Sequence, residues 1–293
     1  MSPPLLAVDV PWLLYRSFFG IPRTIRGAGG MPVNALLGTV NTILALAEWC
    51  SPRAVACCTG AEEAVYRVEL YPPYHAHRDA MPDELRAQWD RAPDLLAALG
   101  WIVASDPELE ADDVMWSCSR IEAAAGGRTL ICSGDRDLYQ TVDASTSVID
   151  LRRDWPPGVI DEDGVRERSG VAPAQIPDLI ALRGDPSDGL PGARGVGAKT
   201  AAALLAEHGS LDGVLGALNQ LRPRIADALR AQADELHRFL DIATLREVAV
   251  ARAPDGATDR ARGAAAAREL GMNALAKRLE EGAVGAPSRR GAR

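Results

Sequence analysis

Short apolar segments alternate with longer amphipathic ones over residues 5 to about 150, and this alternation is what most constrains the fold. The short segments read as buried strands, whereas the longer ones have the apolar spacing of helices. The expected strands cover residues 5–10, 53–58, 101–104 and 128–132, and the expected helices include 34–49 and 93–99. Because strands that alternate with helices form parallel sheets, the sequence predicts an α/β core: a mostly parallel sheet with helices on both faces.

Carboxylates stand at the ends of two of these strands. Asp9 lies near the end of segment 5–10, and Asp135 and Asp137 come directly after segment 128–132. In an open parallel sheet the carboxyl ends of the strands meet at one crevice. By position alone Asp9 could equally cap a turn, but the repeated placement favours a shared site.

A third acidic group, Glu110-Ala111-Asp112-Asp113, opens the apolar run of another expected helix. Taken alone, these acids are explained by capping, because the N–H groups of a first helical turn favour carboxylates. Capping needs one or two acids, however, and this window contains three. Carboxylates held close together repel one another and are costly to desolvate unless they share cations.

Two further acids in the loop 184–192 complete a set drawn from four separate segments. The set is Asp9, Glu110, Asp112, Asp113, Asp135, Asp137, Asp185 and Asp188. No histidine or cysteine set accompanies them, and all-oxygen ligands suit Mg²⁺ or Mn²⁺. Two such ions roughly 4 Å apart would activate water and stabilise the leaving oxygen in phosphodiester hydrolysis. A metal-dependent phosphatase acting on small phosphates is a competing interpretation.

From about residue 171 the sequence becomes all-helical. A glycine turn at 195–201 opens a helix expected over about 198–208. Its two glycines let backbone N–H groups approach a phosphate, and Lys199 adds a positive charge. A plain turn between two helices explains the same residues equally well.

The segment 61–92 places cations among aromatic residues and shows no sustained apolar period. A solvated connection is the simpler interpretation, yet connections of this length in compact domains are usually functional or disordered. Aromatic residues interleaved with cations favour a nucleic-acid contact. Residues 12–19, which include Tyr15 and Arg16, also combine aromatics with a cation, and they are explained either by packing or by a surface that stacks a base and holds a phosphate.

Bulk properties restrict the class of protein. The formal charge of −8 argues against non-specific nucleic-acid binding through net charge, although local basic patches are compatible with it. The five cysteines have neither paired nor zinc spacing and are expected to be reduced, which suggests a cytoplasmic protein. No apolar run is long enough to span a bilayer, and no export signal is recognisable at the N-terminus.

Seven motifs, in order along residues 5 to about 245, resemble the 5′-3′ exonuclease and flap endonuclease family. The resemblance extends to the nuclease region at the N-terminus of bacterial DNA polymerase I. The motifs are Leu5–Val10 with Tyr15-Arg16, Tyr66-Arg67 with Tyr74–Arg78, Glu110–Asp113, Ser133–Leu138, Gly184–Asp188, Pro191-Gly192 and Gly195–Ala201.

The resemblance implies a PIN-like nuclease core in residues 1–170, with an arch or clamp at about 61–92. It implies a helix-three-turn-helix module in 171–260 that grips duplex DNA and can bind K⁺. Residues 261–293 are expected to form a C-terminal helix and a disordered basic tail at 285–293.

The resemblance also assigns roles to single residues. Asp9, Glu110, Asp112, Asp113 and Asp135 would serve a first metal, and Asp135, Asp137, Asp185 and Asp188 a second. Phosphates would meet Arg16, Arg67 and Arg78, a base near the 5′ end would stack on Tyr15, and the duplex backbone would contact Gly195, Gly197 and Lys199.

Three positions depart from the family pattern. Gly60 stands where the family usually has an aspartate, so the first metal site is expected to be weakened. His75 replaces the arch lysine and would carry a charge that depends on its surroundings. Gly189 stands where asparagine is common.

The leading expectation is a metal-dependent, structure-selective DNA nuclease that acts on 5′ ends or 5′ flaps in replication and repair. The chain would act as a monomer and be linked functionally to a separate DNA polymerase and a ligase. The alternatives are a DNA-structure-binding protein whose catalysis is weak or lost because of Gly60, and an RNA-directed PIN-type nuclease.

Overall fold

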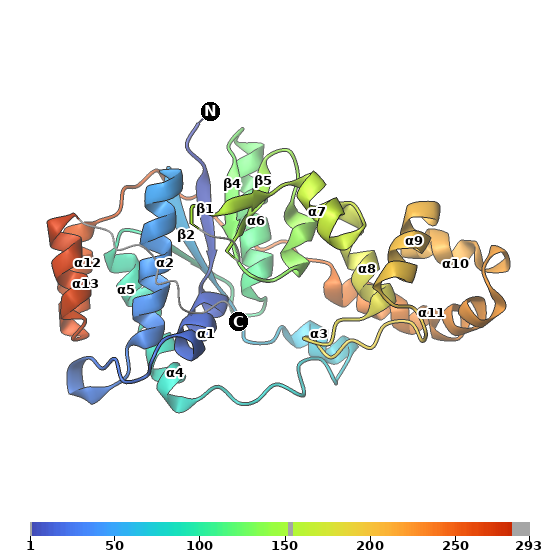
Figure 1. Cartoon of the computed structure of the whole chain (residues 1–293), viewed down its shortest axis with the longest axis horizontal. Helices are drawn as coiled ribbons and strands as arrows, with labels where there is room; N and C mark the ends of the chain where they lie inside the picture. The colour runs from blue at the N-terminus through green and yellow to red at the C-terminus, as the bar shows by residue number, and fades with distance from the viewer. Residues whose placement is uncertain (1, 152–154, 283–293) are drawn as a thin grey trace.

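The computed structural model describes residues 2–151 and 155–282, and its centre is a six-stranded sheet in the order β3-β2-β1-β4-β5-β6 (Figure 1). The strands are β1 Leu5–Asp9, β2 Ala54–Thr59, β3 Ile102–Ser105, β4 Thr129–Cys132, β5 Thr146–Asp150 and β6 Gly158–Ile160. All neighbouring pairs are parallel except β5 and β6, which are antiparallel. The mostly parallel sheet is confirmed, whereas β5 and β6 were not among the expected strands.

The register of the sheet brings the acid-bearing strand ends to one edge. Asp9 pairs with Cys58 of β2, and Val8 pairs with Cys132 of β4. The last residues of β1 and β4 therefore lie side by side, and the loop that follows β4 begins next to Asp9.

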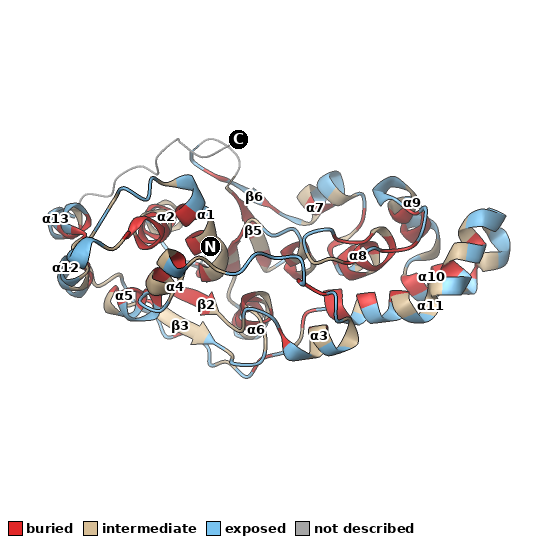
Figure 2. Cartoon of the chain, turned by 90° about the horizontal axis from the view of Figure 1, so that it is seen from below, coloured by how far each residue is buried: buried red, intermediate tan, exposed pale blue. Residues whose placement is uncertain are grey.

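Each face of the sheet has its own buried core, because successive residues of a strand point to opposite faces. Leu6 and Val8 of β1 pack in a core with α1 Val10–Gly20 and α2 Asn34–Cys50. Leu5 and Ala7 pack on the other face, against α6 Ala111–Ala124. Figure 2 shows α1 and α2 on one side of the strands and α6 on the other.

The segment 61–92 is more ordered than the expected solvated connection. It contains α3 Val65–Leu70 and α4 Asp83–Trp89, and α5 Ala92–Ala98 begins at its end. Gln88 of α4 is fully buried, and its Oε1 accepts a hydrogen bond from the backbone N–H of Ala35 at 2.8 Å. The expectation of a solvated connection is therefore wrong for both ends, since helices this short show no apolar period in the sequence.

The second half of the chain is helical, as expected. Its elements are α7 Glu162–Ser169, α8 Ile176–Arg183, α9 Ala198–His208, α10 Leu211–Gly216 and α11 Pro223–Ala243. Short 3₁₀ turns cover η1 Ala28–Gly30, η2 Asp137–Thr141, η3 Pro173–Gln175 and η4 Leu218–Gln220. Helices α8 to α11 form the end of the molecule that lies to the right in Figure 1.

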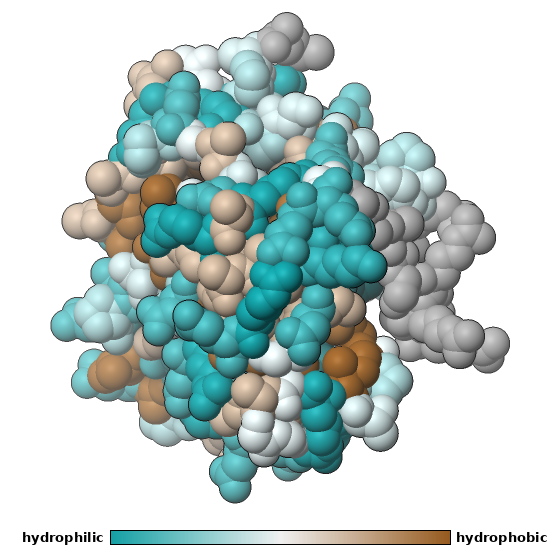
Figure 3. Space-filling model, turned by 90° about the vertical axis from the view of Figure 1, so that its left-hand side faces the viewer, coloured by the Kyte–Doolittle hydropathy of each residue, from teal (hydrophilic) through white to brown (hydrophobic). Residues whose placement is uncertain are grey.

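After α11 the chain returns to the sheet and ends, within the described residues, in α12 Arg260–Glu269 and α13 Asn273–Glu281. One helix was expected here, and two are present. The Leu270 carbonyl accepts a hydrogen bond from the Ala28 N–H at 3.0 Å, which ties this pair to the N-terminal half. Figure 3 shows that this end of the molecule is mainly hydrophilic, with separate small apolar patches. The predicted basic tail at 285–293 lies outside the described residues.

Among the described helices, none is both long enough and apolar enough to cross a membrane.

Candidate active site

Asp9 ends β1 and caps α1. Its Oδ1 accepts the Trp12 N–H at 2.9 Å, and its Oδ2 accepts the Ser133 hydroxyl at 2.6 Å. The side chain is buried, and this desolvation raises its pKa to about 6 even though both hydrogen bonds favour the charged form. Both functions considered for Asp9, the cap and the site acid, are therefore compatible with its position.

Glu110 is held by the segment that begins the arch. Its Oε1 accepts the Ala64 N–H at 2.8 Å, and the Tyr74 hydroxyl lies 3.3 Å from each carboxylate oxygen. Burial raises the pKa of Glu110, and the positive charge of Arg67 partly opposes that rise.

Arg67 lies among the acids at the start of α6. Its guanidinium is 2% exposed and lies 3.0 Å from Glu110, 3.8 Å from Asp112 and 3.2 Å from Asp113. Its Nε also donates to the Ile242 carbonyl at 3.1 Å. In this conformation Arg67 therefore faces carboxylates and not solvent, which differs from the phosphate contact expected of it, because the acids attract the cation into the interior.

Asp113 is fully enclosed, unlike the other expected ligands. Its oxygens accept hydrogen bonds from Arg67, from the Arg246 N–H at 2.7 Å and from the Glu110 N–H at 3.2 Å. Its pKa is raised to about 7, first by burial and then by the neighbouring Asp112.

Asp135 and Asp137 occupy the loop after β4, where Asp135 is exposed and Asp137 is half-buried. Desolvation is the largest cause that raises the pKa of Asp135 to about 7, and Asp188, Asp112 and Asp9 add to it. The pKa of Asp137 lies well above its ordinary value, through desolvation and then through Asp135, Asp188 and Asp185. Over residues 2–151 and 155–282 no lysine, arginine or histidine lies within ion-pair distance of either side chain.

Two hollows share Gly134 and Asp135 in their lining. The smaller, of about 210 Å³, includes Trp12, Arg16 and Tyr139 in its lining. The larger, of about 500 Å³, includes Asp137, Asp185 and Ala198. Gly134 is needed here, because a Cβ on it would lie 2.1 Å from the Trp12 ring.

The loop 184–192 carries Asp185 and Asp188, and the two carboxylates have different neighbours. Asp185 accepts the Ser187 N–H at 2.8 Å and the Ser187 hydroxyl, and it lies 3.4 Å from Arg183. Asp188 Oδ1 lies 3.0 Å from His75 Nε2 and 3.1 Å from Arg78 Nη2.

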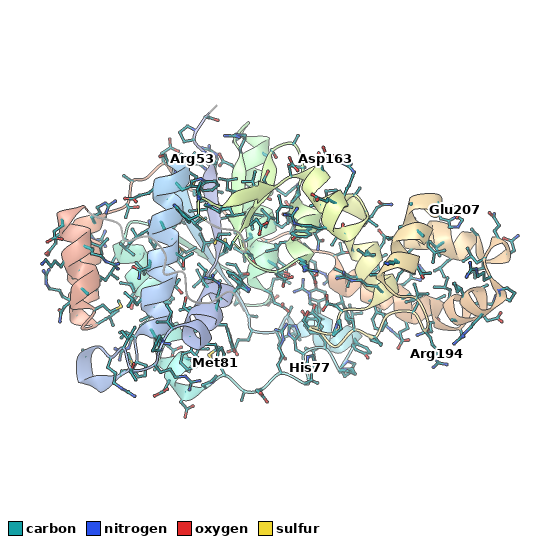
Figure 4. The ribbon with its side chains drawn as sticks, viewed as in Figure 1. Arg53, His77, Met81, Asp163, Arg194 and Glu207 are labelled. Carbon is teal, nitrogen blue, oxygen red and sulfur yellow. The ribbon has the colours of Figure 1, made fainter. Side chains whose placement is uncertain are left out.

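His75 is buried and stacks on Tyr74 with ring centroids 3.8 Å apart. The imidazole therefore contacts the loop acid Asp188, whereas Arg78 remains about half exposed beside it. Figure 4 places the neighbouring His77 on the connection between α3 and α4, along the same lower side as Arg194, the residue before the glycine turn.

The remaining expected contacts lie at the surface of α1 and α9. Arg16 is exposed, with its guanidinium carbon 5.5 Å from the centroid of the Trp12 ring. Tyr15 is half-buried and packs edge-on against Trp89 at 6.3 Å. The glycine turn is open: Gly195, Gly197 and Lys199 are exposed, and no side chain caps the first turn of α9.

Gly60 packs directly against the backbone before α6. A Cβ at this position would lie 2.3 Å from the Leu109 carbonyl oxygen and 2.7 Å from the Glu110 carbonyl carbon. The end of β2 therefore has no room for the aspartate that the family pattern places there.

The sequence did not single out Ser133 or Arg183 as site residues, although the former binds Asp9 and the latter accompanies Asp185. Ser133 lies within the motif Ser133-Gly134-Asp135, so its position next to two acids was a usable signal. Arg183 had no comparable signal, because only the fold of the loop brings it to Asp185.

The donor chemistry of the site fits a hard divalent cation. The carboxyl groups of Asp135 and Asp137 approach other acids, and the positive charge of Arg183 only partly offsets the raised pKa of Asp137, so the ionised forms call for further positive charge. In this conformation no three histidine, cysteine or acidic side chains of residues 2–151 and 155–282 form a set that could hold a metal ion. The acids are therefore collected in one place without being arranged as a closed cage.

Comparison with known proteins defines the class. Residues 4–170 match the 5′-3′ exonuclease N-terminal resolvase-like domain, and residues 171–257 match the 5′-3′ exonuclease C-terminal SAM fold. The chain belongs to the 5′-3′ exonuclease family and is a nuclease, as its motifs predicted.

Relatives of two kinds support this conclusion. A 5′-3′ exonuclease of Streptomyces coelicolor is 37% identical over 270 residues, with 86% of this chain and 89% of that protein covered. A 5′-3′ exonuclease of Mycobacterium tuberculosis is 38% identical over 253 residues, with 79% of each chain covered. DNA polymerase I of Mycobacterium bovis is 36% identical over 263 residues, which are 87% of this chain but only 28% of the polymerase.

Solved structures share the fold at low sequence identity. T5 5′-exonuclease with bound divalent metal ions matches with a TM-score of 0.68 and 20% identity, covering 95% of this chain and 97% of that one. The catalytic core of Rad2 in complex with a DNA substrate matches with a TM-score of 0.64 and 15% identity, covering 97% and 93%.

Proposed function

We propose that this chain is a divalent-metal-dependent, structure-selective DNA nuclease that hydrolyses phosphodiesters at 5′ ends or 5′ flaps. The observation that carries the proposal is the pair Asp135 and Asp137. Neither has a cation partner among the described residues, and both lie in the hollow that reaches the start of α9.

The cation would be Mg²⁺ or Mn²⁺, held by Asp135 and Asp137 together with acids from the neighbouring segments. Those acids are Asp9, Glu110, Asp112, Asp185 and Asp188. Bound there, it would polarise the scissile phosphate and lower the pKa of a water molecule. Because the nearby Glu110 and Asp112 already lie beside Arg67, we place the tighter of two sites at Asp135 and the weaker at α6.

The chain's own residues would bind and orient the nucleic acid. The exposed Arg16 and Arg78 border the acids and can hold phosphates on either side of them. The open N–H groups at the start of α9, with Lys199, suit the backbone of a duplex. Tyr15 would offer its ring to a base at the 5′ end.

In this arrangement residues 1–170 form the nuclease core, with the arch at 61–92, and residues 171–260 form the DNA-binding module. If a K⁺ ion binds in that module, the affinity for duplex DNA should be higher in K⁺ than in Li⁺. A monomer that works with a separate DNA polymerase and ligase is the proposed context in replication and repair.

The proposal is tested by incubating the full chain with a 5′-labelled flap duplex and Mn²⁺ or Mg²⁺. Incision near the junction is expected, and Asp135→Ala should abolish it. Complete absence of cleavage with both metals would rule out the catalytic proposal.

A second function, that of a DNA-structure-binding protein with weak or lost catalysis, is favoured by one observation. Gly60 lacks a side chain and has no space for one, so the α6 half of the site has one ligand fewer than the family pattern. This function predicts flap binding that is indifferent to divalent metal. Measuring flap affinity with Mg²⁺ and with a chelator separates the two functions, and comparing DNA with RNA flaps tests the RNA-directed alternative.

A further inference from the structure

We infer that Asp113 is a positioning residue and not a metal ligand: together with Arg67 it fixes the end of α11 against the start of α6. This inference rests on the proposed function, because Asp113 would position the duplex-binding module relative to the acids. It assigns Asp113 a role different from the one that the family resemblance implies.

The oxygens of Asp113 have no capacity left for a metal. Oδ1 accepts the Arg246 N–H at 2.7 Å and Arg67 Nη2 at 3.2 Å. Oδ2 accepts the Glu110 N–H at 3.2 Å and lies 3.2 Å from the same guanidinium nitrogen. The side chain is 0% exposed, so no path leads from solvent to a remaining lone pair.

The partners of Asp113 belong to both parts of the molecule. Glu110 opens α6, Arg67 lies on α3, and Arg246 follows the last residue of α11 by three positions. Arg67 also donates from Nε to the Ile242 carbonyl in the last turn of α11, at 3.1 Å. One buried ion pair therefore joins the helix that carries the acids to the helix that carries the module.

Three further hydrogen bonds fix the same place. The Val248 N–H donates to the Ser117 hydroxyl of α6 at 2.8 Å. The amide of Gln140 donates to the Ala243 carbonyl at 3.0 Å and accepts the Leu245 N–H at 3.1 Å. The chain just after α11 is thus attached to α6 and to the loop of Asp137.

The length of α11 amplifies any movement at its attached end. It has 21 residues and is therefore about 30 Å long, so a small tilt at its fixed end moves the rest of the module by more. Gln232 of α11 accepts the Arg194 N–H at 2.8 Å, and its amide donates to the Gly192 carbonyl at 3.4 Å. The glycine turn at 195–199 therefore follows the orientation of α11, and the Asp113–Arg67 pair sets how far along the duplex the acids reach.

The test compares Asp113→Asn with its neighbour Asp112→Asn in the full chain. Mn²⁺ binding, followed by electron paramagnetic resonance, should stay within about 3-fold of wild type for Asp113→Asn and weaken about 10-fold or more for Asp112→Asn. On a 5′-flap duplex, Asp113→Asn should spread incision over neighbouring positions. Asp112→Asn should slow incision without moving it.

Ser117→Ala provides a second variant that leaves every acid in place. It removes the acceptor of the Val248 N–H and the hydrogen bond that the Ser117 hydroxyl donates to the Asp113 backbone carbonyl at 2.8 Å. It should broaden the incision position in the same direction with unchanged Mn²⁺ affinity. Hydrogen exchange of the Arg246 and Val248 amides should be faster in Asp113→Asn than in wild type. This measurement reports how firmly the chain after α11 is attached to α6, and it does not require cleavage.

The outcomes separate the two proposals. Loss of Mn²⁺ affinity in Asp113→Asn equal to that in Asp112→Asn would overturn the positioning role, and so would unchanged incision positions together with unchanged hydrogen exchange. If the wild-type chain cleaves nothing, the proposed nuclease function fails, while the hydrogen-exchange comparison still decides whether Asp113 holds the end of α11.

Discussion

The two acidic halves of the site differ in how their charge is compensated. The α6 half, formed by Glu110, Asp112 and Asp113, lies around a buried arginine and receives backbone N–H groups. In the loop half, Asp135 and Asp137 have no such cation within ion-pair distance among the described residues, and desolvation followed by other carboxylates raises their pKa values. The acids of one motif can therefore be compensated by the protein's own arginine, while those of another motif call for a metal.

Removing an acid of the loop half should have the largest effect. Asp137→Asn is expected to slow cleavage about 10³-fold, because a bound metal supplies several kcal/mol of charge stabilisation and each 1.4 kcal/mol is tenfold in rate. Single-turnover cleavage of a 5′-flap duplex measures this. Asp163→Asn on the exposed face of α7 is the control and should cleave like wild type. A loss below tenfold in Asp137→Asn would contradict the contrast between the halves.

Removing the resident cation of the α6 half should act on stability. Arg67→Met leaves buried carboxylates without a partner, and we expect it to lower the free energy of unfolding by about 3–5 kcal/mol. Urea unfolding of the metal-free chain measures the change. Arg166→Met removes an arginine whose pairs are exposed and should cost less than about 1 kcal/mol. Equal losses of unfolding free energy in Arg67→Met and Arg166→Met would mean that Arg67 does not compensate the charge of the buried carboxylates.

Restoring the family residue at Gly60 should not repair the α6 half. Gly60→Asp is expected to lower the free energy of unfolding by about 1–3 kcal/mol, because its Cβ would meet the backbone of residues 109–111. Gly20, which has open space around it, offers the control Gly20→Asp, with a cost below about 1 kcal/mol. Mn²⁺ affinity should not rise in Gly60→Asp. A clear rise in Mn²⁺ affinity at unchanged stability would show that the backbone of residues 109–111 moves to make room for the aspartate, which would contradict this prediction.

The dependence on pH should be the smallest effect and should differ with metal. Burial and neighbouring acids raise the pKa of Asp9 to about 6 and the pKa values of Asp113 and Asp135 to about 7. The unfolded chain ionises aspartate near pH 4, so the folded state binds more protons between these values. The stability contributed by these groups therefore falls as pH rises from about 4 to about 7 in the metal-free chain.

Mg²⁺ favours the ionised acids, so it should raise the melting temperature more at about pH 8 than at about pH 5.5. Thermal unfolding with Mg²⁺ and with a chelator at both pH values measures the difference. Asp137→Asn should show a smaller Mg²⁺ shift than wild type. A larger shift at the lower pH would contradict the proposed charge of the loop half.

Much of the fold could be predicted from local patterns. The strands at 5–10 and 128–132 are short apolar runs with acids after them, and both lie where the pattern placed them. The helices α3 and α4 were not predicted, because each is too short to show an apolar period. The strands β5 and β6 at one end of the sheet were also missed, because neither is a continuous apolar run.

The acids themselves were readable from the sequence, because they follow strand ends that any parallel sheet brings to one edge. The sequence did not show which of these carboxylates already have a cation or a hydrogen-bond donor beside them. Arg67 reaches Asp113 across 46 residues, and the Arg246 N–H reaches it across 133. Neither contact leaves a trace in the local spacing of residues.

The sequence by itself thus determined the α/β core, the helical second half and the positions of the acids along the chain. Only the tertiary structure decided that Glu110 and Asp113 lie beside the cation Arg67, whereas no cation of the described residues lies within ion-pair distance of Asp135 or Asp137. The physical reason is that periodicity reports local conformation, whereas the charge state of a buried carboxylate depends on distant partners that folding brings within a few ångströms.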